Sequence, residues 1–327
     1  MRLGYTGTAY RYHGAARHGL VGRDQVIVDG RTTAQYDWRG LPAPYHEPVA
    51  PRVGEQSPEL QDVRRAAHLG LSVVHTVVTD WSAHNTDSVR AALHESGQEL
   101  VPTVGANMML EGELLDAELS TSTQLIRRYG ELGGVRISKL MVSPMTINRF
   151  RADPPLGEQL RRITAALPRI VQAAEEAGIV LAFENHLDYR VAELLEVICA
   201  IDSPNLRFLF DTGNPFAVCE DPVDAARAAA AHTVLMHVKD VRVLPWTPLS
   251  PGYFACMYVC PLGEGNVDLD AIISIMAERA PDPATLTLAL EIRPVPPYLD
   301  EDRWLEDGIE FMNRRFAQHL TATPPAR

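Results

Sequence analysis

The chain has 327 residues, of which 46% are hydrophobic and 22% are charged, so it has the composition of a soluble globular protein and enough length for one large domain. The formal net charge of −12 argues against a nucleic-acid partner, because binding to a phosphate backbone requires a positive surface. No apolar segment approaches the roughly 18 residues of a membrane span. The N-terminus lacks the basic-then-apolar order of a signal peptide, so we expect a cytoplasmic protein with no membrane partner.

Eight apolar runs have the length and composition of β-strands. Most of them alternate little between apolar and polar residues, as is typical of strands that are covered on both faces. The predicted strands are 2–6, 71–79, 99–104, 134–142, 178–184, 206–211, 233–239 and 285–292.

Amphipathic segments with helix-capping signals fall between these runs. Ser57, Pro58 and Glu59 begin the first helix with a capping residue, a proline in the first turn and an acidic group near the positive end of the helix dipole. Gly70 can end this helix. The other predicted helices are 86–96, 113–131, 156–177, 190–200, 221–231, 268–280 and 301–318.

This alternation of strands and helices predicts an α/β protein, a (β/α)₈ TIM barrel. Residues 1–320 are expected to form this single domain, and residues 321–327 a frayed tail. A doubly wound open sheet is the alternative architecture.

Two connections are too long for ordinary turns. They span 8–56 after the first strand and 241–266 after the seventh strand, and the second contains Trp246. Both would emerge at the C-terminal ends of the barrel strands, where the active sites of this fold lie. They are expected either to wall a substrate pocket, with Trp246 contacting the substrate, or to pack against another subunit of a homo-oligomer.

Four consecutive predicted strands end in a side chain that can bind a metal ion. These side chains are Glu184, Asp211, His237 and Glu291. Three carboxylates and one imidazole held close together would repel one another unless a cation joined them. Ligands rich in oxygen with one histidine suit Mn²⁺ or Mg²⁺, with Co²⁺ and Zn²⁺ as alternatives.

Residues two apart on a strand point to the same side. His186, Lys239 and Arg293 each follow one of the four by two residues, so they are expected to surround a bound substrate with hydrogen-bond donors. Alternatively, Lys239 and Arg293 pair with surface acids, and His186 caps the helix that follows it. Asn107, after the third strand, is a further candidate for substrate contact, with a purely structural role as the alternative.

The segments ENH, DTGNP, HVKD and LEIR, in this order, resemble the xylose isomerase-like barrel superfamily of sugar isomerases and epimerases, which is related in fold to endonuclease IV. In members of that superfamily, the residues that match the four candidates bind one divalent metal. The residues that match Glu184 and Glu291 also form the acid–base pair of the keto-sugar epimerases. Endonuclease IV has a histidine where this chain has Asn214. This difference and the negative net charge both argue against a function in DNA repair.

The resemblance implies a metal-dependent isomerase or epimerase of a keto sugar or related polyol. A metal ion would stabilise the enediolate, while Glu184 and Glu291 move the proton. The alternative is a metal-dependent lyase or dehydratase that acts on a 3-keto sugar, an inosose or an oxidised C-glycoside by β-elimination, in the last case with a second subunit. A non-catalytic, sugar-binding barrel is the third hypothesis.

Overall fold

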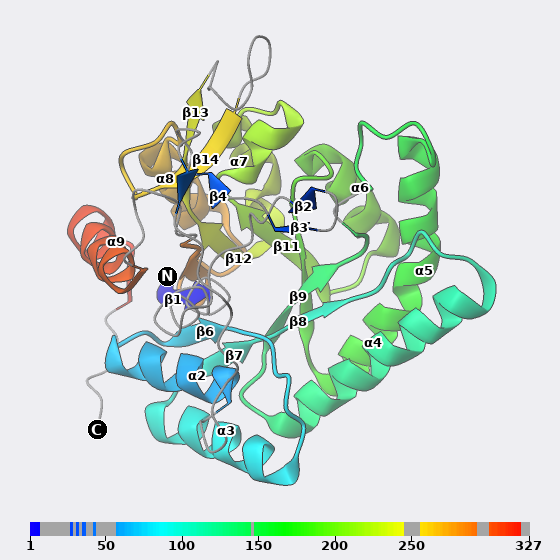
Figure 1. Cartoon of the computed structure of the whole chain (residues 1–327), viewed down its shortest axis with the longest axis horizontal. Helices are drawn as coiled ribbons and strands as arrows, with labels where there is room; N and C mark the ends of the chain where they lie inside the picture. The colour runs from blue at the N-terminus through cyan, green and yellow to red at the C-terminus, as the bar shows by residue number, and fades with distance from the viewer. Residues whose placement is uncertain are drawn as a thin grey trace.

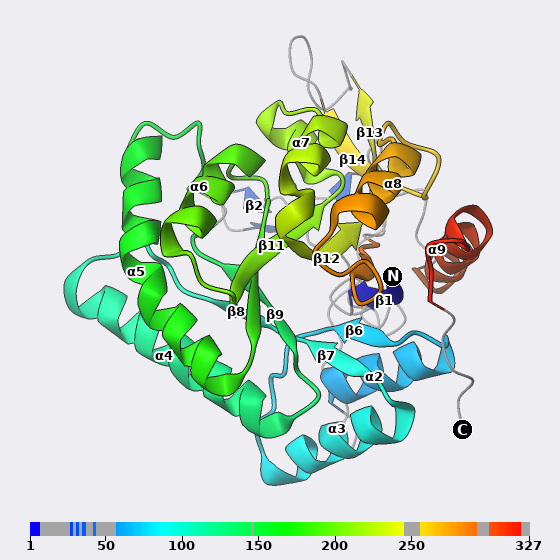
Figure 2. The ribbon, with the colours of Figure 1, turned by 180° about the vertical axis from the view of Figure 1, so that it is seen from behind.

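The structure, a computed structural model, describes residues 1–6, 57–144, 147–244, 256–292 and 301–321, together with the backbone of four two-residue strands between 27 and 43. Figures 1 and 2 show the helices arranged around a central group of strands, with the N-terminal strand near the middle. Within the described residues, no helix combines the length and the apolar character that crossing a membrane requires.

A nine-stranded parallel sheet forms the barrel, in the order β7-β6-β1-β15-β12-β11-β10-β9-β8. The strands at the two ends of this order, β7 and β8, are separated in sequence by Pro102 alone, so the sheet closes into a ring. This closure confirms the predicted TIM barrel and shows that the open-sheet alternative was wrong. The strands are β1 (Arg2–Thr6), β6 (Val73–His75), β7 (Glu99–Val101), β8 (Thr103–Gly105), β9 (Ile137–Met141), β10 (Val180–Glu184), β11 (Leu206–Asp211), β12 (Thr233–Val238) and β15 (Thr287–Leu290).

The helices lie close to their predicted positions. Ser57 caps the first one by accepting a hydrogen bond from the backbone N–H of Leu60 at 3.3 Å. The second begins three residues earlier than predicted, because Ser82 caps it in the same way through Asn85. The helices are α2 (Pro58–His68), α3 (Ala83–Ser96), α4 (Gly112–Leu132), α5 (Leu156–Ala177), α6 (Val191–Ile201), α7 (Pro222–Ala229), α8 (Leu269–Arg279) and α9 (Glu301–Phe316), with short 3₁₀ helices at Asn214–Val218 and Ala230–His232.

The barrel interior contains an apolar layer and, one step further along the strands, a polar layer. Seven strands each contribute one residue to the apolar layer, a buried cluster separate from the main core: Val73, Val101, Ile137, Ala182, Leu209, Leu235 and Ala289. Residues two positions later point to the same side of the sheet. These residues are His75, Thr103, Lys139, Glu184, Asp211, His237 and Glu291. The sheet therefore places a ring of polar side chains at the C-terminal end of the barrel.

The long connection after β12 contains a hairpin that the sequence analysis did not predict. Strand β13 (Asp240–Leu244) pairs antiparallel with β14 (Cys256–Cys260), and Figure 1 shows this hairpin beside α7 and α8. The connection after β1 contains β2 (Ile27–Val28) paired with β3 (Arg31–Thr32), and β4 (Gln35–Tyr36) paired with β5 (Pro42–Ala43). At the other end of the chain, Thr321 donates a backbone hydrogen bond to Met1 at 2.7 Å, and residues 322–327 lie outside the described part.

Candidate metal centre

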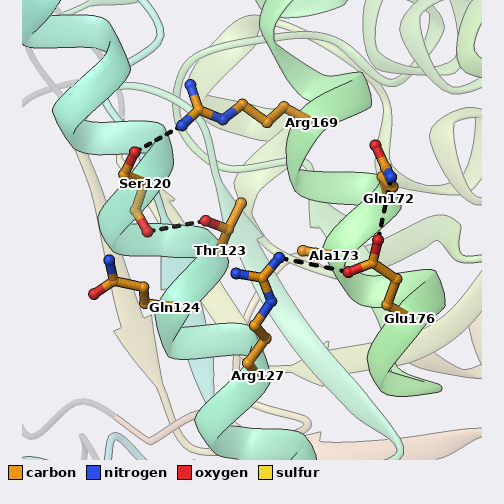
Figure 3. Close-up of a pocket in the computed structure, with 8 residues that line it drawn as sticks. All are labelled: Ser120, Thr123, Gln124, Arg127, Arg169, Gln172, Ala173 and Glu176. Atoms are coloured by element: carbon orange, nitrogen blue, oxygen red, sulfur yellow. Dashed lines mark hydrogen bonds and ion pairs between the residues drawn. The ribbon is translucent and has the colours of Figure 1, made fainter.

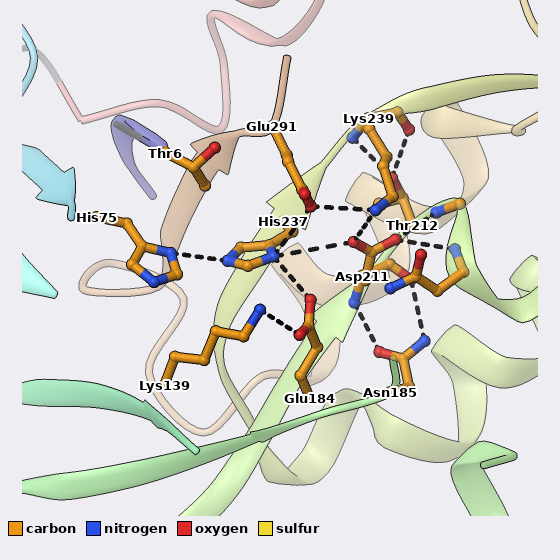
Figure 4. Close-up of polar contacts among 12 residues, drawn as sticks. Thr6, His75, Lys139, Glu184, Asn185, Asp211, Thr212, His237, Lys239 and Glu291 are labelled. Atoms are coloured by element: carbon orange, nitrogen blue, oxygen red, sulfur yellow. Dashed lines mark hydrogen bonds and ion pairs between the residues drawn. The ribbon is translucent and has the colours of Figure 1, made fainter. Parts of the chain in front are cut away.

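The four candidate ligands converge at the C-terminal end of the barrel. One ligand atom of each of Glu184, Asp211, His237 and Glu291 lies within 4.8 Å of the others, and all four side chains are buried. The Nδ1 atom of His237 lies 2.9 Å from Glu184 Oε1, 3.2 Å from Glu291 Oε2 and 3.9 Å from Asp211 Oδ2. Figure 4 shows the three carboxylates gathered around this imidazole. The predicted convergence is therefore present, while the roles of the four residues stay predictions.

The allocation of hydrogen bonds fits a cation between these groups. Asp211 accepts backbone hydrogen bonds from Gly213 and Asn214 on Oδ1, both at 2.9 Å. Its Oδ2 atom and Glu184 Oε2 are buried, and each lies in an ion pair with a lysine ammonium and receives no backbone hydrogen bond. Buried carboxylates need a cationic partner to offset the cost of burial, and a divalent ion could share this role with the ammonium groups. The donor set, with three carboxylates and one imidazole, suits a divalent ion such as Mn²⁺ or Mg²⁺.

His75 and Thr103 orient the His237 imidazole through polar contacts on the side away from the carboxylates. Its Nε2 atom lies 3.0 Å from Nδ1 of His75, and Nε2 of His75 lies 3.0 Å from the hydroxyl of Thr103. Burial and the neighbouring His237 hold the pKa of His75 well below its usual value, so His75 is neutral. If each Nε2 carries the proton and donates it to the next of these groups, Nδ1 of His237 keeps its lone pair for a metal ion.

Two lysines enter the same cluster. Lys139 on β9 forms an ion pair with Glu184 Oε2. The ammonium of Lys239, which follows β12, lies 2.7 Å from Asp211 Oδ2 and 3.1 Å from Glu291 Oε2. The expectation that Lys239 lies on the same side as His237 is confirmed, and its alternative pairing with a surface acid is wrong, because both carboxylates are buried. Lys139 was missed because it stands in the middle of a predicted strand.

The electrostatic environment differs among these groups. Although burial favours its neutral form, the charges of Lys139 and His237 hold the pKa of Glu184 well below its usual value. Burial, together with the charges of Glu291 and Glu184, raises the pKa of Asp211 to about 6, against the opposing charge of Lys239. Burial works against the ammonium of Lys239, but the nearby carboxylates outweigh it and raise its pKa.

Polar residues next to the cluster fix the ends of the strands. Asn185 accepts a hydrogen bond from the backbone N–H of Asp211 at 2.7 Å and donates one to its carbonyl at 3.1 Å. Thr212 holds the backbone of Lys239 in the same two-sided manner, at 3.0 and 2.6 Å. Asp240 accepts four backbone N–H groups, including those of Gly263 at 3.0 Å and Gly265 at 2.9 Å. These contacts account for the polar residues that flank the predicted ligands in sequence.

The other predicted substrate contacts have different outcomes. His186 lies beside Glu184 and Asp188 at a small hollow after β10, and burial lowers the pKa of its imidazole. The side chain of Asn107 accepts a backbone hydrogen bond from Met109 at 3.1 Å, which is a local turn contact, and its role toward a substrate stays a prediction. Arg293 and Trp246 lie outside the described residues.

A hollow of about 260 Å³ lies elsewhere, on the surface between α4 and α5. Figure 3 shows that its charged groups pair with one another and with nearby polar side chains, as Arg127 does with Glu176 at 3.5 Å and Arg169 with Ser120 at 2.6 Å. These groups are exposed and partnered, so the barrel end is the stronger candidate for chemistry.

Residues 63–315 match the protein family described as "Xylose isomerase-like TIM barrel". The chain belongs to this family. The matched span includes every strand of the barrel except β1, and all four candidate ligands.

Two curated proteins are similar over part of their length. The chain is 31% identical over 128 residues to 3-oxo-isoapionate decarboxylase of Pectobacterium atrosepticum, which is 38% of this chain and 43% of that protein. It is 25% identical over 124 residues to the uncharacterized protein YihM of Escherichia coli, which is 38% of this chain and 36% of that protein. The matched segments therefore span less than half of these relatives.

Solved structures share the fold at low identity. A D-psicose 3-epimerase from Clostridium cellulolyticum H10, solved with D-tagatose, has a TM-score of 0.62 and 14% identity, over 96% of this chain and 99% of that chain. The IOLI protein with a bound zinc atom has a TM-score of 0.62 and 15% identity, over 80% of this chain and 94% of that chain. The fold of this family member is thus that of sugar epimerases and isomerases.

Proposed function

We propose that the protein is a divalent-metal-dependent isomerase or epimerase of a keto sugar or related polyol. The observation that carries this proposal is the convergence of Glu184, Asp211, His237 and Glu291 on one point at the C-terminal end of the barrel. Mn²⁺ is the preferred ion from the donor chemistry. The zinc atom in the IOLI structure supports a divalent metal in this fold and leaves its identity open here.

A bound divalent ion would polarise the carbonyl group of a keto sugar and stabilise the negative charge that develops on its oxygen. Glu184 and Glu291 approach Nδ1 of His237 from β10 and from the end of β15, so one carboxylate lies on each side of the centre. The pKa of Glu184 is low, so this carboxylate is ionised at neutral pH and can accept a proton from the substrate carbon. Glu291 can return a proton to the other face.

The place of proton return decides the reaction. Return to the same carbon inverts its configuration, and return to the neighbouring carbon isomerises the sugar. The same pair of carboxylates can serve both reactions, so the four candidate ligands support the class and not one member of it.

A lyase is the second candidate, and one similarity favours it. A relative that is 31% identical over 128 residues is a 3-oxo-isoapionate decarboxylase. A divalent ion held at the candidate metal centre would stabilise the negative charge that is left when the carbon next to the ketone loses a proton or carbon dioxide. After proton loss, this charge can expel hydroxide from the following carbon, which is β-elimination. The proposed centre therefore also suits cleavage next to a 3-keto group.

Proton NMR in D₂O separates these candidates. The full chain is loaded with Mn²⁺ and reacted with ketohexoses and 3-keto sugars. Mn²⁺ is then removed from the reaction mixture before the spectra are recorded. Deuterium incorporation with inversion or isomerisation supports the first proposal, and release of water or carbon dioxide supports the second. Absence of all turnover together with sugar binding would favour the non-catalytic barrel.

Two variants test the acid–base assignment. Glu184→Gln and Glu291→Gln should each lower turnover by at least about a thousandfold, because a glutamine amide can neither accept a proton from the substrate carbon nor return one to it. Glu176→Gln, on the outer face of α5, is the matched control and should retain the wild-type rate. Turnover within tenfold of wild type in either of the first two variants would refute the assignment.

A further inference from the structure

Lysine is rare in this protein and occurs only at the candidate metal centre. Positions 139 and 239 carry the only two lysines in the 327-residue sequence, and the other 28 basic residues are arginines. Both lysines are nearly inaccessible, with exposed fractions of 9% for Lys139 and 6% for Lys239. An ammonium is a compact point charge, whereas a guanidinium is a broad planar fork. All the remaining basic positions carry arginine, so the two compact ammonium groups occur only at two places that contact the same cluster.

The charge of the centre explains what two such cations can do. Among the groups that contact one another there, three carboxylates meet two ammonium groups, so these five groups sum to one negative charge. A His237 imidazole that binds a metal ion is neutral and adds nothing to the sum in the metal-bound centre. A divalent cation on the carboxylates changes this sum to one positive charge. A buried net charge without a partner is costly. A neutral sugar leaves that charge in place, whereas a substrate with one negative charge balances it.

The positions of the lysines point to the same conclusion. Lys139 approaches Glu184 from β9, while Lys239 approaches Asp211 and Glu291 from the end of β12. Figure 4 shows the two ammonium groups on different sides of His237. The oxygens that they contact belong to the candidate ligands, so a metal ion on those oxygens would compete with both ammonium groups for the same negative charge.

We propose, building on the proposed function, that the substrate is a monoanionic sugar derivative such as a keto sugar acid, and that the positive charges of Lys139 and Lys239, which flank the centre, attract its carboxylate. The two lysines are then specificity-determining residues. They select an acid over the corresponding neutral sugar, and proton transfer remains with Glu184 and Glu291.

The test compares two probes that differ only in charge at one end. L-Threonate and L-threitol have the same four-carbon polyol skeleton, with a carboxylate in the first where the second has a hydroxymethyl group, and neither has a ketone that could react. Isothermal titration calorimetry on the Mn²⁺-loaded full chain should show threonate binding at least tenfold tighter than threitol. Equal affinity for the two probes would overturn the proposal.

Variants assign the preference to the lysines. Lys139→Met and Lys239→Met should each reduce the threonate preference at least fivefold and change threitol affinity by less than threefold. Arg127→Met, on the outer face of α4, is the matched control and should keep the preference. An undiminished preference in both lysine variants would refute their role. The same variants should bind Mn²⁺ more tightly, because each loses a positive charge beside the ligands. Tighter Mn²⁺ binding without any loss of the threonate preference would mean that the lysines only balance the charge of the metal-free centre.

A measurement on the unmodified sequence covers the case in which a variant does not fold. Reductive methylation of the Mn²⁺-loaded protein can act on only two side-chain amines, and the amino group of Met1 is an internal reference. Because both lysines are nearly inaccessible, the reaction is run until both are modified in the ligand-free, Mn²⁺-loaded protein. Threonate should slow this modification of Lys139 and Lys239 in peptide mass spectra, and threitol should not. Lack of Mn²⁺ binding would refute the proposed function, whereas Mn²⁺ binding without protection or preference would refute only the anionic substrate.

Discussion

Replacing Asn185 by alanine tests whether the strand ends determine metal binding. Asn185 is 1% exposed, and its amide makes both hydrogen bonds to the backbone of Asp211, at 2.7 and 3.1 Å. Its loss leaves a buried N–H and a buried carbonyl without these partners, at about 1–3 kcal/mol each, so the variant should lose about 2–6 kcal/mol of unfolding free energy. Because Asp211 is a candidate ligand, Mn²⁺ affinity should also fall, by about 10- to 100-fold as for other residues that orient metal ligands.

Asn205 provides a matched control at the opposite end of the same strands. Its amide donates one hydrogen bond to the carbonyl of Ile179, just before β10, at 2.9 Å. Asn205→Ala should cost about 0.5–1.5 kcal/mol of stability and leave Mn²⁺ affinity unchanged, because the N-terminal end of a TIM barrel serves stability. Urea unfolding and calorimetric Mn²⁺ titration measure the two effects. Equal Mn²⁺ affinity in the two variants would show that Asp211 does not bind the ion or does not need this support.

Three further predictions follow from single residues. Burial raises the pKa of Asp188 from 3.8 to about 7, so the folded state binds the proton of this carboxyl more tightly than the unfolded state does. The protein should therefore lose up to about 4 kcal/mol of unfolding free energy as the pH rises from 4 to 7. Asp188→Asn should remove this loss when urea unfolding is compared at pH 5 and pH 8, and an unchanged pH dependence in the variant would contradict the assignment. Asp240→Asn should lower the unfolding free energy by about 2–5 kcal/mol, because its new NH₂ group faces the N–H groups of Gly263 and Gly265, and thermal unfolding unchanged from wild type would refute this. His186→Ala should raise KM by a larger factor than it lowers kcat, since His186 is expected to bind the substrate. A fall of kcat by the same factor as the rise of KM would indicate a role in the reaction itself.

The strand ends could be predicted from the sequence because one physical rule links them. Parallel strands of a barrel finish at the same rim, so polar residues that end consecutive apolar runs come together there. Glu184, Asp211 and His237 lie at or one residue before the ends of their strands, and Glu291 directly follows its strand. No knowledge of side-chain contacts is needed for this step.

Contacts between a long side chain on one strand and a residue on the neighbouring strand could not be predicted in the same way. Lys139 lies in the middle of β9, and its ammonium crosses to Glu184 on the neighbouring strand. Its position two residues after Ile137 of the apolar layer was the available signal, but recognising it requires knowing which residues face inward. The hairpin of β13 and β14 had alternation in Asp240–Leu244 as its signal, which the length of the connection obscured.

The geometry of the candidate metal centre is set by the sheet and not by the connections. Asp211 and His237 are direct register partners on neighbouring strands. The backbone N–H of Glu291 donates to the carbonyl of Val238 at 2.9 Å, which fixes it beside His237. A change in a connection between strands leaves this register intact, so such changes can alter the substrate while the four ligands stay together. If the four candidate ligands hold a metal ion, the chemistry they support is that of a polarised ketone. The choice of substrate would then come from residues outside the ligand set, such as Lys139 and Lys239, which contact it.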